Sequence, residues 1–191
     1  MPDLLLVAAT DRELCGHDGL VCGVGPVEAA SATARALALR RFAAVLHVGL
    51  AGGRGIAVGE LVVGTEAVYC DLSADWPVVD RVEPDARLVA ALGAALPAAA
   101  PLPIHTSAAV GGAGPTVSQG PLVEAMEGFG VLRAAARAGV PAVEVRAISN
   151  MLGEQDRARW SLEEGLTALG RALPVLVDAA RAAAVHPDGA A

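Results

Sequence analysis

Short apolar runs alternate along the chain with longer segments in which apolar positions recur at helical spacing. Continuous apolar runs of this length, bounded by glycine, proline or polar residues, are typical of buried strands. The predicted strands are residues 4–9, 20–24, 43–48, 60–69, 104–110 and 142–148. The predicted helices are residues 27–42, 85–96, 122–138 and 161–184. This alternation predicts an α/β fold, a three-layer αβα sandwich with a mixed, mostly parallel central sheet.

The length of the chain predicts a single domain. Its 191 residues fall within the range of about 100–200 residues that one domain typically holds. We expect this domain to span residues 1–185 and an Ala-rich tail, residues 186–191, to be disordered. Hydrophobic residues make up 54% of the chain, which is enough apolar surface for a core and excludes a disordered protein.

The charge balance narrows the class of partner. Lys and Arg number 14 against 21 Asp and Glu, which gives a formal net charge of -7. Nucleic acids and anionic membranes both require a basic surface on the protein that binds them. We therefore expect neither as a partner, and a small-molecule ligand instead.

Three features indicate a cytoplasmic protein. Residues 88–123 contain no Asp, Glu, Lys or Arg, but their prolines and glycines exclude a membrane-spanning helix. Asp3 stands where a signal peptide would carry positive charge. The three cysteines are odd in number and lack CxxC spacing, so we expect neither a disulfide nor a metal site. No cofactor motif is present in the sequence, and we expect no cofactor.

Polar residues and glycines follow several predicted strands. Ligands of open α/β sheets bind beyond the carboxyl ends of the strands. The candidate site segments are therefore residues 10–13, 49–53, 126–130 and 146–150. Glu13 is either a solvated acid, stabilised at a helix start by the helix dipole, or a base that activates water. The glycine-rich segment 49–53 is interpreted as a tight turn.

Glu127 is predicted to lie within an apolar helical run, where an unpaired carboxylate is strongly unfavourable. Two partners would satisfy it: a hydroxylated ligand, or a structural ion pair with Arg133 or Arg146. Ser149 and Asn150 follow a predicted strand and have a simpler interpretation as caps of the next segment.

Several of these motifs together resemble the nucleoside phosphorylase superfamily, on its nucleosidase side. They are residues 22–30, 47–53, 58–63, 126–127 and 146–150. Within the superfamily the chain is similar to the futalosine hydrolases at residues 69–75, 126–130 and 144–153, together with Asp156, Arg157 and Trp160. This resemblance implies a nucleosidase of menaquinone biosynthesis that cleaves futalosine into hypoxanthine and dehypoxanthine futalosine. It also implies a homo-oligomer.

The resemblance assigns a role to each matched residue. Glu13 would orient and deprotonate the water, and Asn150 would face N7 of the purine. Glu127 would accept hydrogen bonds from the 2′- and 3′-hydroxyls of the ribose. The remaining substrate-binding residues implied by the match are Ala51, Gly52, Met126, Arg146 and Ser149, and Phe129 and Val117 are the candidates for stacking on the base.

Asn150 departs from the related methylthioadenosine/S-adenosylhomocysteine nucleosidases, which have an Asp there as general acid. An amide donates a hydrogen bond but gives up no proton. Hypoxanthine carries an oxygen at C6 that takes up charge as the base leaves, so the substitution favours a 6-oxopurine.

Other functions stay open at this point. The chain is shorter than its relatives between Glu13 and the strand at Val21, and between Thr116 and Met126. It could be a nucleosidase of the methylthioadenosine type, or a degenerate protein that binds nucleosides without cleaving them. A nucleoside phosphorylase would need an Arg-lined anion site, for which Arg12 and Arg54 are the nearby candidates.

Overall fold

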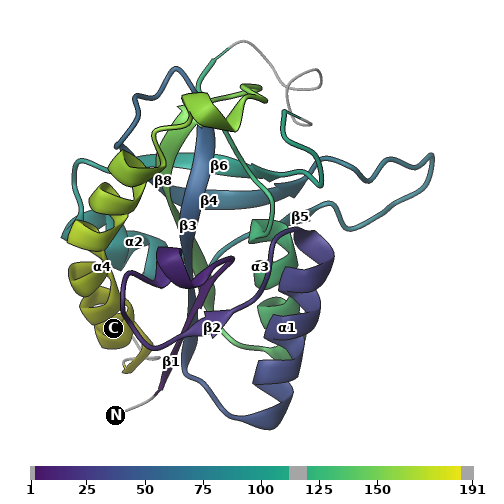
Figure 1. Ribbon diagram of the computed structural model, residues 1–191. Helices are drawn as coiled ribbons and strands as arrows, with labels where there is room; N and C mark the ends of the chain where they lie inside the picture. Colours follow the sequence, from purple (N-terminus) through teal and green to yellow (C-terminus); the bar gives the residue numbers. More distant parts are fainter. Residues whose placement is uncertain (1–2, 112–119, 186–191) are drawn as a thin grey trace.

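The computed structural model of the protein describes residues 3–111 and 120–185 (Figure 1). Within these residues one sheet is formed by β1 Leu4–Ala8, β2 Leu20–Val21, β3 Ala44–Arg54, β4 Leu61–Tyr69, β5 Arg81–Val82, β6 Ala100–Thr106, β7 Leu122–Ala125 and β8 Ala142–Met151. The helices are α1 Pro26–Leu39, α2 Ala86–Ala95, α3 Gly128–Ala138 and α4 Leu162–Val185, with the short 3₁₀ helices η1 Asp11–Leu14 and η2 Arg157–Arg159. The predictions for Val117 and for the tail 186–191 lie outside the described residues. No described helix is long and apolar enough to cross a membrane.

The sheet is mixed and mostly parallel, as predicted. The pairs β1–β2, β1–β3, β3–β8, β4–β6 and β6–β7 are parallel, whereas β3–β7, β4–β5 and β4–β8 are antiparallel. The pairs that run from β3 through β8, β4, β6 and β7 back to β3 close part of the sheet on itself. This closure places β7 and β8 on the two sides of the same end of β3.

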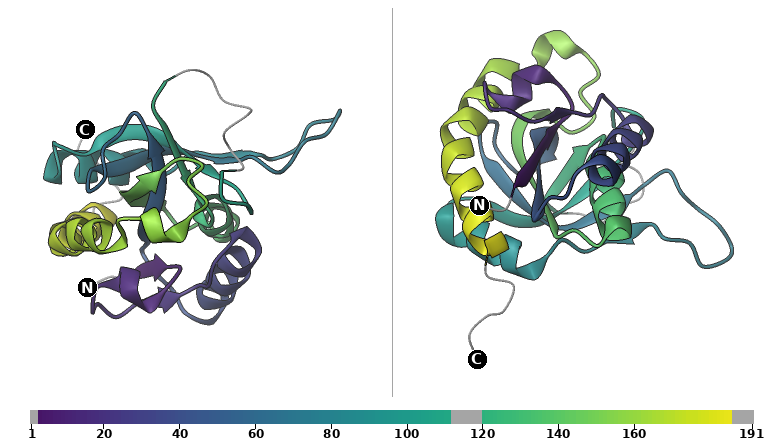
Figure 2. Two further views of the ribbon diagram at one scale, coloured as in Figure 1. Left: turned by 45° about the horizontal axis from the view of Figure 1, so that its top comes forward. Right: turned by 90° about the horizontal axis from the view of Figure 1, so that it is seen from below.

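Helices cover both faces of the sheet, with α2 and α4 on one side and α1 and α3 on the other (Figure 2). Val45 and Leu46 are neighbours on β3, and both are fully buried. Successive side chains of a strand point to opposite faces. Accordingly, Leu46 packs in the core that contains Leu173 of α4, and Val45 in the core that contains Val131 of α3. The predicted three-layer α/β architecture is confirmed.

The glycine-rich segment 49–53 is not a turn, and that prediction is wrong. It continues β3 to Arg54 and pairs in parallel with β8, with a register shift between Ala51 and Gly52. The glycines are required for close approach, since a Cβ at Gly49 would lie 2.4 Å from Nη1 of Arg146. The segment therefore forms the floor of a site rather than a loop around it.

The predicted helix 122–138 is also wrong in its first part. Residues Leu122–Ala125 form β7, which pairs with β3 and β6, and α3 begins only at Gly128. A segment of only four residues, three apolar and one acidic, fits a helix or a strand equally well by pattern. The pairing with β3 and β6 makes it a strand. Glu127 therefore lies at the N-cap of α3 and not within a helical run.

Strand boundaries differ from the prediction at three further places. Strand β6 begins at Ala100, before Pro101 and Pro103, and ends at Thr106. Its proline-containing half pairs with β4 alone, because β7 joins only from Ile104 onward, and proline is tolerated where a strand is paired on one side. Strand β2 is only two residues long. Strand β8 runs on through Ser149 and Asn150 to Met151, so these residues do not cap a following segment.

Candidate active site

A cavity of about 340 Å³ lies at the carboxyl ends of β1, β3 and β8. Most of the predicted site residues line it, namely Glu13, Ala51, Gly52, Met126, Glu127, Ser149 and Asn150. They come from segments far apart in the sequence, and the closure of the sheet brings them together. The structure does not bring Phe129 or Arg146 to the cavity wall.

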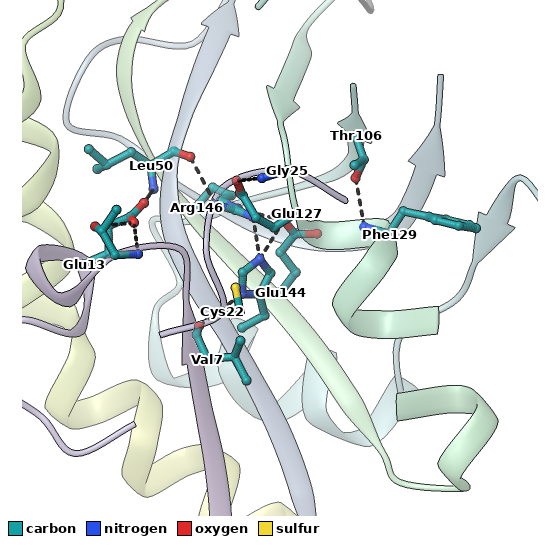
Figure 3. A network of polar contacts seen from close by, with 12 residues as sticks. Val7, Glu13, Cys22, Gly25, Leu50, Thr106, Glu127, Phe129, Glu144 and Arg146 are labelled. Carbon is teal, nitrogen blue, oxygen red and sulfur yellow. Dashed lines mark hydrogen bonds and ion pairs between the residues drawn. The ribbon is translucent and has the colours of Figure 1, made fainter. Parts of the chain in front are cut away.

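Glu13 is held at the cavity by three hydrogen bonds. Its Oε2 accepts from the Thr10 backbone N–H at 3.0 Å and from the Thr10 hydroxyl at 2.7 Å. Its Oε1 accepts from the Leu50 N–H at 2.9 Å (Figure 3). The residue is only 7% exposed, so the interpretation as a solvated acid is wrong. The carboxylate is fixed in place at the end of β1 and against β3.

Glu127 forms a buried ion pair with one of its two predicted partners. Its Oε2 lies 3.2 Å from Nη2 of Arg146, and its Oε1 accepts from the Gly25 N–H at 3.1 Å. The residue is 4% exposed and still lines the cavity. From the sequence, an ion pair and a ligand contact were alternative partners for Glu127. The geometry allows both at once.

Arg146 lies beneath the cavity, fully buried, and its guanidinium links four groups. Nε donates to Oε1 of Glu144 at 2.7 Å, and Nη1 donates to the Leu50 carbonyl at 3.2 Å. Nη2 donates to Glu127 and contacts Nε2 of His47 at 2.5 Å (Figure 3). The predicted contact of Arg146 with substrate is therefore wrong, because its guanidinium binds other protein groups and the residue does not line the cavity. One of these groups is the carboxylate of Glu127, which Arg146 holds in place.

The groups around Arg146 have shifted pKa values. Burial lowers the pKa of His47, and the neighbouring Arg146 lowers it further. Since Nδ1 of His47 lies 3.0 Å from the Val7 carbonyl, the neutral ring donates from Nδ1 and accepts from Arg146 at Nε2. Burial raises the pKa of Glu144 despite Arg146, and its Oε2 has no hydrogen-bond partner.

Ser149 orients Asn150 at the cavity wall. The Ser149 hydroxyl lies 2.8 Å from Oδ1 of Asn150 and 3.3 Å from the Ala51 carbonyl. Nδ2 of Asn150 donates to the Met151 carbonyl at 3.0 Å. This bond uses one of the two amide hydrogens, and the other remains for a ligand.

The aromatic residue at the cavity is Trp160, and the assignment of Phe129 is wrong. Phe129 stacks on Tyr69 with ring centroids 5.1 Å apart and points away from Glu13 and Glu127 (Figure 3). Trp160 lines the cavity with Arg157, whose guanidinium lies 5.5 Å from the indole ring. Both residues were present in the matched motif, but no role was assigned to them. Glu124 was missed because its segment was predicted to be helical.

The predicted anion-binding arginines are not arranged for phosphate. Arg12 lines the cavity, but its Nη2 pairs with Oε1 of Glu163 at 2.5 Å. Nε of Arg54 donates to the Gly120 carbonyl at 3.1 Å, and Arg54 does not line the cavity. Across residues 3–111 and 120–185 no group of three or more His, Cys, Asp or Glu is arranged to hold a metal ion.

Three futalosine hydrolases are similar to the chain. The protein from Streptomyces coelicolor is 39% identical over 189 residues, which cover 84% of this chain and 80% of the relative. The protein from Acidothermus cellulolyticus is 34% identical, with coverage of 88% and 78%. The protein from Thermus thermophilus is 31% identical, with coverage of 89% and 84%.

Solved structures share the fold at lower identity. A 5′-methylthioadenosine/S-adenosylhomocysteine nucleosidase from Helicobacter pylori superposes with a TM-score of 0.80 at 19% identity and covers 93% of this chain and 99% of its own. The nucleosidase from Colwellia psychrerythraea, in complex with adenine, has a TM-score of 0.78 at 20% identity, with coverage of 93% and 95%. The model of the phosphorylase superfamily matches residues 19–183. The chain therefore belongs to the phosphorylase superfamily and, within it, to the family of the futalosine hydrolases.

Proposed function

We propose that the protein hydrolyses the N-ribosyl bond of futalosine and releases hypoxanthine. The observation that carries this proposal is the placement of two buried carboxylates, Glu13 and Glu127, and the amide of Asn150 around one cavity. The similarity to three futalosine hydrolases supports the choice of substrate. A role in menaquinone biosynthesis, a cytoplasmic location and a homo-oligomeric assembly are part of the same proposal and stay predictions.

Glu13 supplies the base in this mechanism. Cleavage of an N-ribosyl bond passes through a sugar with oxocarbenium character, which water then attacks. An ionised carboxylate has about four lone-pair sites, and Thr10 and Leu50 fill three of those of Glu13. The remaining site accepts a hydrogen bond from the attacking water and takes up its proton.

Glu127 and Asn150 bind the two parts of the nucleoside. Glu127 accepts hydrogen bonds from the ribose hydroxyls, with Met126 beside it at the cavity wall. Arg146 holds the Glu127 carboxylate from below, so that the acid is fixed before the substrate binds. The free amide hydrogen of Asn150 donates to N7 of the leaving base and stabilises the charge that develops there.

The proposed substrate is tested by comparing two nucleosides on the unmodified protein. We expect release of hypoxanthine from futalosine and little release of adenine from methylthioadenosine, because the amide of Asn150 cannot protonate the adenine ring. Chromatography of the free bases measures both rates. Comparable rates on the two nucleosides would show that the protein is a nucleosidase of the methylthioadenosine type.

The substitution Asn150→Asp tests the role of the amide. Since general acid catalysis typically contributes about 10²–10⁴ in rate, we expect hydrolysis of methylthioadenosine to rise at least tenfold in this variant. The control Asn150→Leu keeps a similar side-chain size without donors and should lower activity on both nucleosides. Unchanged activity of Asn150→Asp on methylthioadenosine would refute the role at N7.

Glu127→Gln separates ribose binding from the ion pair. Arg146 keeps Glu144 as a charged partner in this variant, so we expect only a modest fall in the unliganded melting temperature. The stabilisation by the ribosyl product should be lost, because hydrogen bonds to charged groups are worth about 1.5–3 kcal/mol each. Melting curves with and without product measure both effects.

The matched control is Glu144→Gln, the same substitution at the other carboxylate of Arg146. Glu144 is buried but does not line the cavity. This variant should retain the shift produced by the product. If Glu127→Gln also retains the shift and loses only stability, Glu127 is a structural ion-pair partner and does not bind ribose.

A further inference from the structure

The cavity has a buried polar end and a solvent-facing rim. The groups that the proposed hydrolysis uses, Glu13, Glu127 and Asn150, are between 4% and 7% exposed. At the rim, Val24 is 56% exposed and the side chain of Arg12 is 58% exposed. The polar end takes the base and the 2′- and 3′-hydroxyls of the ribose. The 5′ position is therefore the part of the nucleoside that faces the rim.

The rim combines apolar side chains with positive charge. Trp160, Leu162 and Leu166 line it and are half-buried. Arg12 and Arg157 line the same cavity and are exposed, whereas the acids of the cavity wall are buried. Indole and leucine side chains bind flat apolar groups, and a guanidinium binds an anion. Such a rim matches a substituent that has an apolar body and an anionic end.

Arg157 is the rim arginine whose charge is not compensated. Arg12 forms an ion pair with a glutamate of α4. The two acids nearest to Arg157 in the sequence are Glu154 and Asp156, and both pair with Arg159 instead. Arg157 itself forms no ion pair with any carboxylate in the part of the chain that the structure describes. Its guanidinium is therefore available to an anion that enters the cavity.

The guanidinium of Arg157 is held over the ring of Trp160. Its Cζ lies 5.5 Å from the ring centroid. Nε1 of Trp160 donates to the Glu154 carbonyl at 2.8 Å, which fixes the orientation of the indole. A guanidinium that stacks on an aromatic face keeps the N–H donors along its edge, and two of them can bind one carboxylate. Arg157 and Trp160 thus form a preorganised pair at the rim.

We propose that Arg157 binds a carboxylate at the end of the 5′ substituent, while Trp160 packs against the apolar part of that substituent. Arg157 is then a specificity-determining residue. This assignment rests on the proposed function, in which a nucleoside occupies the cavity. Futalosine fits it, because this nucleoside carries a carboxyphenyl group on its 5′ side. Methylthioadenosine has an uncharged thioether there and gains nothing from Arg157.

Binding of the ribosyl product tests the assignment without any need for turnover. Dehypoxanthine futalosine keeps the carboxylate, and its methyl ester lacks the charge. Calorimetry with both is done on the parent, on Arg157→Gln and on the control Arg171→Gln, which removes the same charge from an exposed residue outside the cavity. We expect the parent and the control to bind the acid about tenfold more tightly than the ester. Arg157→Gln should bind the two equally.

The comparison of acid and ester on the parent alone does not depend on the folding of a variant. Equal binding of the two, or an unchanged preference for the acid in a folded Arg157→Gln, would overturn the assignment. Inorganic phosphate is the other anion that this guanidinium can bind. If phosphate binds only when Arg157 is present, and the parent does not distinguish acid from ester, the rim is a phosphate site and the assignment is wrong. If futalosine is not hydrolysed but the preference for the acid depends on Arg157, the proposed function fails and this inference stands.

Discussion

Glu13→Gln is expected to slow hydrolysis of futalosine by about 10²–10⁴, the range typical of general base catalysis. The amide has no basic oxygen to take the proton from water. Both oxygens of Glu13 accept hydrogen bonds from Thr10 or Leu50. In the variant, the NH₂ group of Gln therefore faces a hydrogen-bond donor and not an acceptor. We therefore expect an additional loss of stability of about 1–3 kcal/mol.

Turnover numbers and melting curves, measured on the same preparation, separate these two effects. The assay temperature must lie below the melting transition of the variant. The control Glu83→Gln removes an exposed carboxylate and should change neither quantity. A folded Glu13→Gln variant that turns over within roughly threefold of the parent, or about 0.7 kcal/mol in activation free energy, is incompatible with Glu13 as the base.

Arg146→Met is expected to have the largest effect on stability. The substitution leaves the carboxylates of Glu127 and Glu144 buried without their shared cation. Removing one partner of a buried ion pair typically costs about 3–5 kcal/mol in the free energy of unfolding. Denaturant titration measures this quantity in the parent and in the variant.

Two further variants show whether burial of the ion pairs causes the loss of stability expected for Arg146→Met. Arg81→Met makes the same change at the exposed pair with Glu66, where about 0–1 kcal/mol is expected. Combining Arg146→Met with Glu144→Gln removes one orphaned charge and should restore part of the stability. A loss for Arg146→Met no larger than that for Arg81→Met would mean that the buried cluster does not depend on its cation.

The sequence predicts the fold class because the buried strands and the covering helices each have a recognisable local pattern of apolar residues. The fully buried apolar run around Val45 and Leu46 indicates a strand covered on both faces. The helical spacing of α4 and its start after Ser161 are equally local. In contrast, residues Leu122–Ala125 are a strand only because β3 and β6 pair with them. A pattern of four residues contains no information about such partners.

The site residues that lie in family motifs could be predicted from the sequence. Those whose position depends on packing or strand register could not. Glu13, Glu127 and Asn150 were identified through the family motifs, and the structure places all three at the cavity. Phe129 stands in a matched motif too, yet its half-buried ring stacks on Tyr69 and does not line the cavity. Glu124, which also lines the cavity, was missed because its segment was predicted to be helical. Its position opposite Gly52 depends on strand register. Register is a property of the closed sheet and not of any local sequence.

The most direct test of the central claim is the fate of futalosine with and without phosphate. The unmodified protein is incubated with futalosine in phosphate-free buffer and again with added phosphate, and the products are separated by chromatography and identified by mass. We predict equal rates of hypoxanthine release in both buffers, with one equivalent of unphosphorylated ribosyl product. Release that requires phosphate and yields a ribosyl phosphate, or no release in either buffer, would contradict the assignment of the protein as a hydrolase of futalosine.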